Sequence, residues 1–228
     1  MIAENLTQIK ERIARAAERA QRNAEDVRIV AAAKGQGKLK IEEAIAAGIS
    51  IIGHNYLQEA VQEVFSGNSA DVEFHMIGHL QRNKAGKAAE LFHVIQTVDD
   101  PRLAAALNSR CEACNRTTGV LIQVNLALEP QKSGIPEDEV QSLAEHIRGL
   151  PFLKLMGLMT MPPFFDDPKR ARPYFARLRE LREKLQSSGV MSSEMYELSM
   201  GMTGDFEAAV EEGATLVRIG SALFGPRS

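Results

Sequence analysis

The chain contains 228 residues, of which 44% are hydrophobic and 25% charged, with 27 Lys and Arg against 30 Asp and Glu. This size and apolar content exclude intrinsic disorder, and a formal net charge of −3 excludes a globally basic nucleic-acid binder. No apolar run is long enough to span a membrane, the N-terminus lacks the apolar core of a signal peptide, and two cysteines make no disulfide scaffold. We expect a soluble cytoplasmic protein with one domain over residues 1–228.

The opening segment predicts an amphipathic helix. Apolar residues recur there at spacings of three and four: Leu6, Ile9, Ile13, Ala16, Ala17 and Ala20. After it, eight short apolar runs alternate with helix-like segments, which is typical of parallel strands buried on both faces. The predicted strands are residues 27–34, 49–54, 74–79, 93–99, 119–125, 154–161, 196–201 and 216–220.

The segments between these strands carry helix signals. Two apolar faces have helical spacing: Val140, Leu143, Ala144 and Ile147, and then Tyr174, Leu178, Leu181 and Leu185. Pro136 stands where a first turn begins, and Gly48 and Gly189 stand where a left-handed residue ends a helix. Eight repeats of about 28 residues predict a closed (β/α)₈ TIM-type barrel with an extra N-terminal helix. An open doubly wound sheet is the alternative.

Polar residues gather at the carboxyl ends of the predicted strands, where such a barrel places its chemistry. They are Lys34, His54, Asn55, His79, Asp99, Asn125, Thr160, Ser199, Arg218, Gly220 and Ser221. Each alone has a structural explanation, but together they predict a site at the mouth of the barrel. A lysine such as Lys34 that loses hydration there becomes nucleophilic and suits Schiff-base chemistry, although the position also marks a strand's exit into solvent.

The last two loops predict an anion site. Residues 199–213, SMGMTGDFEAAVEEG, contain a strand end, a glycine turn and a helix start with Thr203 as N-cap and Asp205 in the first turn. Residues 217–225, VRIGSALFG, form a strand that opens into a second glycine turn. Exposed backbone N–H groups at such turns bind phosphate in many barrels. In this sequence the hydroxyls of Ser199 and Ser221 are expected to add to the anion site. Together with Lys34 they predict a phosphorylated aldehyde, with pyridoxal 5′-phosphate (PLP) as the obvious candidate.

These segments resemble the PLP homeostasis proteins, which are similar to the N-terminal barrel domain of alanine racemase. The resemblance covers nearly the whole chain and is carried by AAAK at 31–34, GHNYLQE at 53–59, HMIGHLQRNK at 75–84, QVNLALEPQKSG at 123–134, MGLMTMPP at 156–163, SMGMTGD at 199–205 and VRIGSALFG at 217–225. It implies a fold-type III PLP barrel in which Lys34 forms the Schiff base.

The resemblance also implies the remaining cofactor contacts. Ser199, Gly220 and Ser221 are expected to bind the phosphate, with backbone help from Met200 and Gly201. Arg218 is expected to face the pyridine nitrogen, and Asn55 to contact the ring. Two positions depart from the family pattern. Gly35-Gln36-Gly37 follows the lysine where the family usually has Thr-Lys/His-Pro, which predicts a looser loop, and His54 replaces a glutamate.

The implied function is intracellular PLP homeostasis, in which the protein holds PLP and buffers it or delivers it to apo PLP-dependent enzymes, with indirect effects on amino-acid balance. The cationic Arg218 opposes protonation of the pyridine nitrogen and so weakens the electron sink. The chain also ends three residues after Gly225, which leaves no length for the second domain that supplies alanine racemase with a tyrosine base. We therefore expect little or no turnover, a monomer, and neither nucleic-acid nor membrane partners.

Two alternatives stay open. One is a PLP-dependent amino-acid racemase or related enzyme of low activity that uses His79 or His54 as its base. The other is a barrel that binds a phosphorylated sugar without PLP, in which Lys34 is dispensable. Cys111 and Cys114 are interpreted as ordinary thiols, because one pair supplies only two of the four ligands of a zinc site. The stiff apolar segment 162–165, PPFF, is a candidate lid or docking surface at the barrel mouth.

Overall fold

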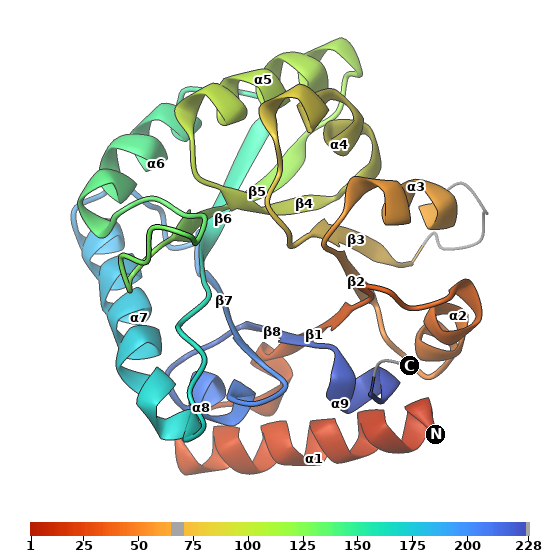
Figure 1. The fold of residues 1–228 in the computed structure, drawn as a ribbon. Coiled ribbons are helices and arrows are strands. Elements are labelled where there is room, and N and C mark those ends of the chain that lie inside the picture. The colour runs from red at the N-terminus through yellow and green to blue at the C-terminus, as the bar shows by residue number, and fades with distance from the viewer. Residues whose placement is uncertain (65–70, 227–228) are drawn as a thin grey trace.

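Parallel strands close into a barrel in the order in which they occur in the chain (Figure 1). The computed structural model describes residues 1–64 and 71–226. In this part of the chain the strands are β1 Arg28–Ala32, β2 Ile51–His54, β3 Glu73–Met76, β4 Val94–Val98, β5 Thr118–Val124, β6 Leu153–Thr160, β7 Glu197–Met202 and β8 Leu216–Ile219. Pairing of β1 with β8, from Arg28 opposite Leu216 to Ala31 opposite Ile219, closes the barrel.

Helices form an outer ring around the barrel (Figure 1). The helices that follow the strands are α2 Lys38–Ala46, α3 Leu57–Val64, α4 Ala85–Leu91, α5 Pro101–Ala113, α6 Val140–Arg148, α7 Arg172–Ser187, α8 Phe206–Glu211 and α9 Ser221–Phe224. Short 3₁₀ turns are η1 Ala24–Asp26, η2 Arg82–Lys84, η3 Glu137–Glu139 and η4 Pro168–Ala171. The extra helix, α1 Ile2–Arg19, packs its apolar face against α8 and α9.

The predicted closed barrel and its N-terminal helix are therefore confirmed, and the open-sheet alternative is wrong. Each predicted strand is present, and the glycines expected to end helices, Gly48 and Gly189, have φ angles of +104° and +74°. The strand ends differ most at β1 and β3. After Ala32 the chain turns out of the sheet, because Gln36 N–H donates back to the Ala33 carbonyl over 2.9 Å.

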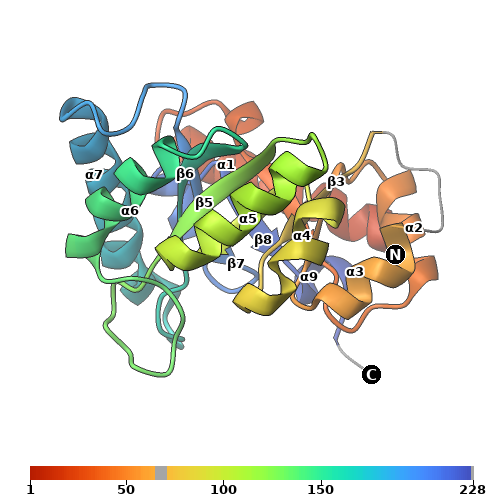
Figure 2. The same ribbon diagram turned by 90° about the horizontal axis from the view of Figure 1, so that it is seen from above.

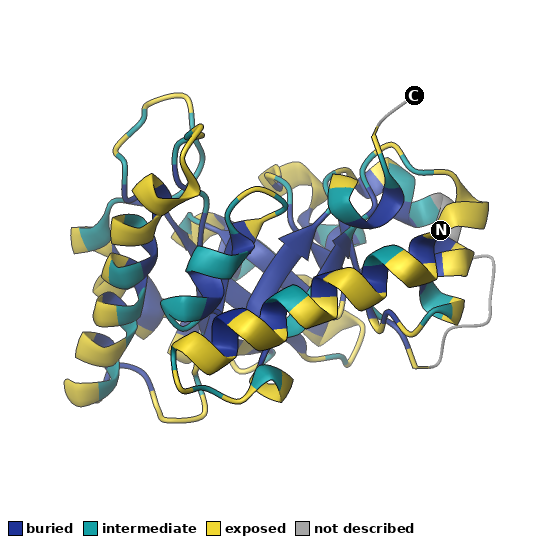
Figure 3. Cartoon of the chain, turned by 90° about the horizontal axis from the view of Figure 1, so that it is seen from below, coloured by how far each residue is buried: buried dark blue, intermediate teal, exposed yellow. Residues whose placement is uncertain are grey.

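Two layers are buried, as Figure 3 shows by the dark blue of the strands and of the inner faces of the helices. The outer layer lies between the barrel and the helices and includes Phe92, Phe175 and Phe206. The apolar contents of the barrel interior are Val30, Ile51, Ile77, Val94, Leu121, Met159 and Leu216. Because side chains alternate along a strand, each strand contributes to both layers.

The loops at the carboxyl ends of the strands differ in length. Figure 2 shows the long loop between β5 and α6 projecting at the same end of the barrel as the loop after β6 and the short α9. The first two loops are joined, since Lys132 Nζ donates to the Pro162 carbonyl over 3.0 Å. None of the helices in residues 1–64 and 71–226 has the length and apolar content that crossing a membrane requires.

Candidate functional site

A cavity of about 540 Å³ opens at the carboxyl ends of the strands. Five residues predicted for the site line it: Lys34, Asn55, Arg218, Gly220 and Ser221. The apolar part of the wall comes from Ile77, Met161 and the loop after β6, including Phe164 and Phe165. This volume lies within the range of ordinary ligand pockets.

A second cavity, of about 610 Å³, lies at the opposite end, where the strands begin. Its charged side chains are largely occupied with one another. Arg28 pairs with Glu197, Arg179 with Glu212, and Arg182 donates to the Tyr196 carbonyl over 3.1 Å. The cavity at the carboxyl ends is therefore the better candidate for a ligand site, as expected for this barrel.

Lys34 stands in the turn after β1, and its side chain is half-buried. Its ammonium lies 5.3 Å from the centre of the Tyr56 ring, within cation–π range. The turn is held by Ala33 N–H, which donates to the Gly53 carbonyl over 2.9 Å. Gly35 has a φ of +69°, which a glycine adopts without strain. The segment Gly35-Gln36-Gly37, which departs from the family pattern, thus begins with a turn closed by the hydrogen bond from Gln36 N–H to the Ala33 carbonyl.

Arg218 projects into the barrel from β8 and is only 4% exposed. Its Nη1 donates to Ser199 Oγ over 2.7 Å, and its Nη2 donates to the Thr160 carbonyl over 2.9 Å. Burial lowers the pKa of the Arg218 guanidinium to about 10, against a smaller opposing effect of Asp205. That value is well above neutral pH, so the site keeps a fixed cation on its floor.

The structure gives Ser199, Met200 and Gly201 positions behind the cavity rather than on its wall. The Ser199 hydroxyl is fully buried and donates to Gln96 Oε1 over 2.6 Å while accepting from Arg218. Met200 is buried in the layer between barrel and helices. Gly201 has a φ of +91°, and a Cβ there would lie 2.5 Å from the Ala209 Cβ. These residues lie next to the cavity wall, where the Ser199 hydroxyl contacts Arg218 and Gln96, and the predicted phosphate contacts of Ser199, Met200 and Gly201 stay predictions.

The loop after β7 contributes cavity residues from the segment predicted as a helix start. Thr203, Gly204 and Asp205 line the cavity. The N-cap of α8 is Asp205 and not Thr203, and its Oδ1 accepts from Met202 N–H over 2.6 Å. Burial raises the pKa of the Asp205 carboxyl, while the Met202 N–H and the Arg218 charge lower it. Thr203 Oγ1 accepts from Ala222 N–H over 3.4 Å and so joins the loops after β7 and β8.

The prediction that His54 lies at the mouth is wrong. Asn55 faces the cavity, so the preceding residue points the other way, into the layer between barrel and helices. The His54 ring is fully buried, with its centre 6.1 Å from that of Phe74 and 6.3 Å from that of Phe92. Burial lowers the pKa of the His54 imidazole to about 4, so it is neutral at physiological pH.

The remaining strand-end residues hold loops. His79 is exposed, with Nδ1 3.1 Å from Ser133 Oγ, and lines a neighbouring cavity of about 460 Å³ that also touches Asn55. Asn125 donates to the Glu129 carbonyl over 2.9 Å, and Asp99 accepts from Gly134 N–H over 2.9 Å. Thr160 reaches the site through its carbonyl alone.

The two cysteines show no shared site. Cys111 is buried, with its thiol donating to Thr118 Oγ1 over 3.3 Å, whereas Cys114 is exposed. Within the described ranges no group of three or more His, Cys, Asp or Glu side chains is arranged to hold a metal ion. The interpretation of both cysteines as ordinary thiols stays a prediction.

Comparison with known proteins places this geometry in a family. The family model for the N-terminal domain of alanine racemase matches residues 5–228. A pyridoxal phosphate homeostasis protein of Aquifex aeolicus is 39% identical over 224 residues, covering 98% of this chain and 97% of that protein. One from Escherichia coli is 38% identical over 229 residues, covering 99% and 97%. The chain belongs to the pyridoxal phosphate homeostasis protein family.

Solved structures agree with this family membership. PipY of Synechococcus elongatus, whose structure has PLP bound, is 32% identical, with a TM-score of 0.85. The match covers 99% of this chain and all of that one. An alanine racemase of Clostridium difficile is 15% identical, with a TM-score of 0.77 over 99% of this chain and 56% of that one, which shows the shared fold alone. The predicted resemblance is thus confirmed across nearly the full length of the family's barrel.

Proposed function

We propose that this protein holds PLP at the mouth of its barrel through Lys34 and serves intracellular PLP homeostasis, buffering the cofactor or delivering it to apo PLP-dependent enzymes. The observation that carries the proposal is the meeting of three groups on one cavity wall. These are the Lys34 amine, the buried Arg218 cation, and the hydroxyl- and glycine-containing loops after β7 and β8. PipY, with PLP bound in its structure, shares this fold at 32% identity.

The residues present fit the three parts of PLP. Lys34 supplies the amine that an aldehyde requires, from a turn that leaves it partly open to solvent. Arg218 presents a fixed donor for the pyridine nitrogen. The Thr203 and Ser221 hydroxyls, with the backbone at Gly204 and Gly220, form the phosphate side of the wall. Asn55 contributes a side-chain amide beside the ring. We treat residues 1–228 as one PLP-binding barrel domain.

The site suits holding PLP better than turning over amino acids. Bound PLP supplies an electrophilic carbon and an electron sink, and the sink is strongest when its pyridine nitrogen is protonated. Arg218 is cationic at neutral pH and opposes that protonation. No histidine lines the cavity formed by the described residues, so neither His54 nor His79 serves as a base in the present geometry. We propose a carrier rather than an enzyme.

The competing function is a PLP-dependent enzyme of low activity. The observation in its favour is Asp205, a carboxylate on the cavity wall whose pKa is raised by burial. Against it, the Asp205 carboxylate is already engaged by Met202 N–H. Incubation of the PLP-loaded protein with single L- and D-amino acids, followed by chiral chromatography, separates the two functions. We expect no sustained racemisation or product release, and steady turnover would overturn the carrier proposal.

An absorption spectrum tests the cofactor directly. Purified protein incubated with PLP should show a visible band that borohydride removes, and mass spectrometry should then place one reduced PLP on the peptide containing Lys34. Lys34→Ala should lack both signals. Lys38→Ala is a matched control, since Lys38 is exposed and pairs with Glu42. Absence of the band in the unaltered protein would leave only a phosphate-binding barrel.

A further inference from the structure

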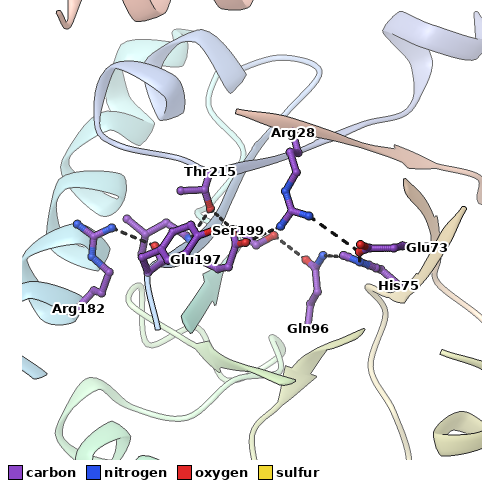
Figure 4. A network of polar contacts seen from close by, with 10 residues as sticks. Arg28, Glu73, His75, Gln96, Arg182, Glu197, Ser199 and Thr215 are labelled. Atoms are coloured by element: carbon purple, nitrogen blue, oxygen red, sulfur yellow. Dashed lines mark hydrogen bonds and ion pairs between the residues drawn. The ribbon is translucent and has the colours of Figure 1, made fainter. Parts of the chain in front are cut away.

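A chain of polar side chains runs through the barrel interior from Ser199 to Glu73 (Figure 4), and its Ser199 end contacts Arg218. Ser199 Oγ, which accepts from Arg218, lies 2.6 Å from Gln96 Oε1. Gln96 Nε2 lies 2.8 Å from His75 Nδ1, and His75 Nε2 lies 2.9 Å from Glu73 Oε2. The chain therefore crosses from β8 through β7, β4 and β3, and reaches the opposite end of the barrel from the cavity.

The far end of the chain is anchored by a second arginine. Arg28 Nη1 lies 4.0 Å from Glu73 Oε2, and Arg28 also pairs with Glu197, as Figure 4 shows. Thr215 Oγ1 donates to the other oxygen of Glu197 and accepts from Leu198 N–H over 2.9 Å. Glu73 is thus held at the start of β3 as an acceptor.

The direction of each hydrogen bond follows from this anchor. The hydrogen bond from His75 and the charge of Arg28 lower the pKa of the Glu73 carboxyl, so it is ionised and only accepts. His75 Nε2 must therefore donate. Burial lowers the pKa of the His75 imidazole despite Glu73, so the ring is neutral and its Nδ1 accepts from the Gln96 amide. Gln96 Oε1 then accepts the Ser199 proton, which leaves the Ser199 oxygen as acceptor for Arg218.

Burying a chain of polar side chains in a barrel interior is energetically unfavourable compared with burying apolar ones. Such interiors are usually packed with branched apolar side chains, as Val30, Ile51 and Leu121 are here. His75, Gln96 and Ser199 are each completely buried, and buried polar groups destabilise the fold unless every partner is in place. Apolar side chains of similar volume would satisfy packing more simply, so the hydrogen-bonded chain requires another explanation.

We infer that Gln96 and His75 are positioning residues for the cofactor. Through Ser199 they hold the Arg218 guanidinium where it meets the pyridine nitrogen of PLP, and Glu73 sets the direction of the whole chain. The inference rests on the proposed PLP site. Without Gln96, the Ser199 hydroxyl loses the acceptor that fixes the direction of its proton. That proton can then point toward Arg218, so that two donors face each other and the Ser199 oxygen no longer holds the guanidinium. Arg218 is then free to turn toward Asp205, the carboxylate whose charge already acts on it.

Gln96→Met tests this role because it keeps the side-chain volume and removes the polar chain. We expect PLP affinity, measured by fluorescence or equilibrium dialysis, to fall about ten- to one-hundred-fold. This is the effect of losing one hydrogen bond from a charged group, here the bond from the Arg218 guanidinium to the pyridine nitrogen. The visible band of the bound cofactor should also move, since the group facing the pyridine nitrogen has changed. Gln123→Met is the matched control, because Gln123 is also buried but donates to the Ser133 carbonyl.

A double-mutant cycle separates positioning from general damage. If Gln96 acts only through Ser199, the pair Gln96→Met and Ser199→Ala should weaken PLP binding no more than either single change. Additive losses, or an unchanged affinity and band in Gln96→Met, would overturn the inference. If Gln96→Met does not fold, Gln96→Glu takes its place. A glutamate still accepts from Ser199, so we expect folded Gln96→Glu to bind PLP more tightly than Ser199→Ala, and equal weakness would overturn the inference.

The unaltered protein distinguishes this inference from the proposed function. A wild-type chain that binds no PLP would overturn both. A wild-type chain that binds PLP as expected, beside a Gln96→Met variant with the same affinity and spectrum, would overturn only the positioning role. Circular dichroism and thermal unfolding of every variant confirm that the comparison is made between folded proteins.

Discussion

The two sides of the cofactor cavity differ in how firmly the chain holds them. Arg218 lies within β8, is 4% exposed, and has two hydrogen-bond acceptors that are themselves held by the barrel. Lys34 lies two residues beyond the end of β1 and is half-buried, and its ammonium lies over the face of the Tyr56 ring. In the proposed site, the Arg218 side is therefore organised before the ligand arrives, whereas Lys34, the proposed covalent attachment point, is reached from solvent. This division suits the proposed role of holding PLP and exchanging it.

The strongest test of this difference is Lys34→Ala. We expect complete loss of borohydride-reducible PLP, because the amine is removed, with unfolding free energy changed by no more than about 0.5 kcal/mol, as for other partly exposed side chains. Weak PLP binding should persist, since Arg218 and the two loops are untouched. Reduction followed by mass spectrometry and a denaturant titration measure the two quantities. Loss of stability comparable with loss of binding would show that the lysine side is as structural as the arginine side.

Two glycines with positive φ make a matched pair across the cavity. Gly201 supports the arginine side at φ +91°, and Gly35 shapes the lysine side at φ +69°. A Cβ at Gly201 would meet Ala209 at 2.5 Å and Phe206 at 3.0 Å, but a Cβ at Gly35 meets nothing within 4 Å. We expect Gly201→Ala to lower the unfolding free energy by about 2–5 kcal/mol, from strain plus overpacking, and Gly35→Ala by about 1–2 kcal/mol, from strain alone. Equal losses in urea denaturation would contradict the difference in packing.

Arg218→Lys measures how much of the arginine side depends on the guanidinium fork. A lysine keeps the charge but cannot reach Ser199 Oγ and the Thr160 carbonyl with the same geometry. We expect a loss of about 1.5–3 kcal/mol in unfolding free energy, the value of one hydrogen bond from a charged group, together with weaker PLP binding. Thermal unfolding with and without PLP measures both. An unchanged affinity would remove Arg218 from the recognition of the pyridine nitrogen.

The sequence predicts more of the lysine and arginine sides than of what lies between them. Lys34, Arg218, Gly220 and Ser221 were predictable because polar residues at the ends of apolar strands stand out in a barrel pattern. His54 was misplaced because neighbouring residues on a strand face opposite sides, and the position of the strand end decides which of His54 and Asn55 reaches the cavity.

The support behind Arg218 was hidden for a different reason. Gln96 stands in the apolar run 93–99, where its polarity is a visible exception, but its partners His75 and Ser199 come from other strands. Only the stagger of strands around the closed barrel shows which inward residues lie at the same height. Thr203 and Asp205 are harder to recognise as cavity residues, because hydroxyl and carboxylate groups serve both helix caps and ligand sites.

The smallest expected effect concerns the loop that borders both sides. Phe165 packs on Tyr174 with ring centres 5.9 Å apart, whereas Phe164, also on the cavity wall, is 89% exposed. Phe165 thus anchors the loop and Phe164 is available to cover bound PLP. We expect Phe164→Ala to leave the unfolding free energy within about 0.5 kcal/mol of the unaltered protein and to speed the release of PLP modestly. The release rate is measured by the transfer of PLP to an apoenzyme that traps it. Phe165→Ala is the comparison, with a stability loss of about 1 kcal/mol or more from the lost aromatic contact. Unchanged release in a variant that carries both Phe164→Ala and Phe165→Ala would leave the lysine turn as the barrier to exchange and would remove the lid role of this loop.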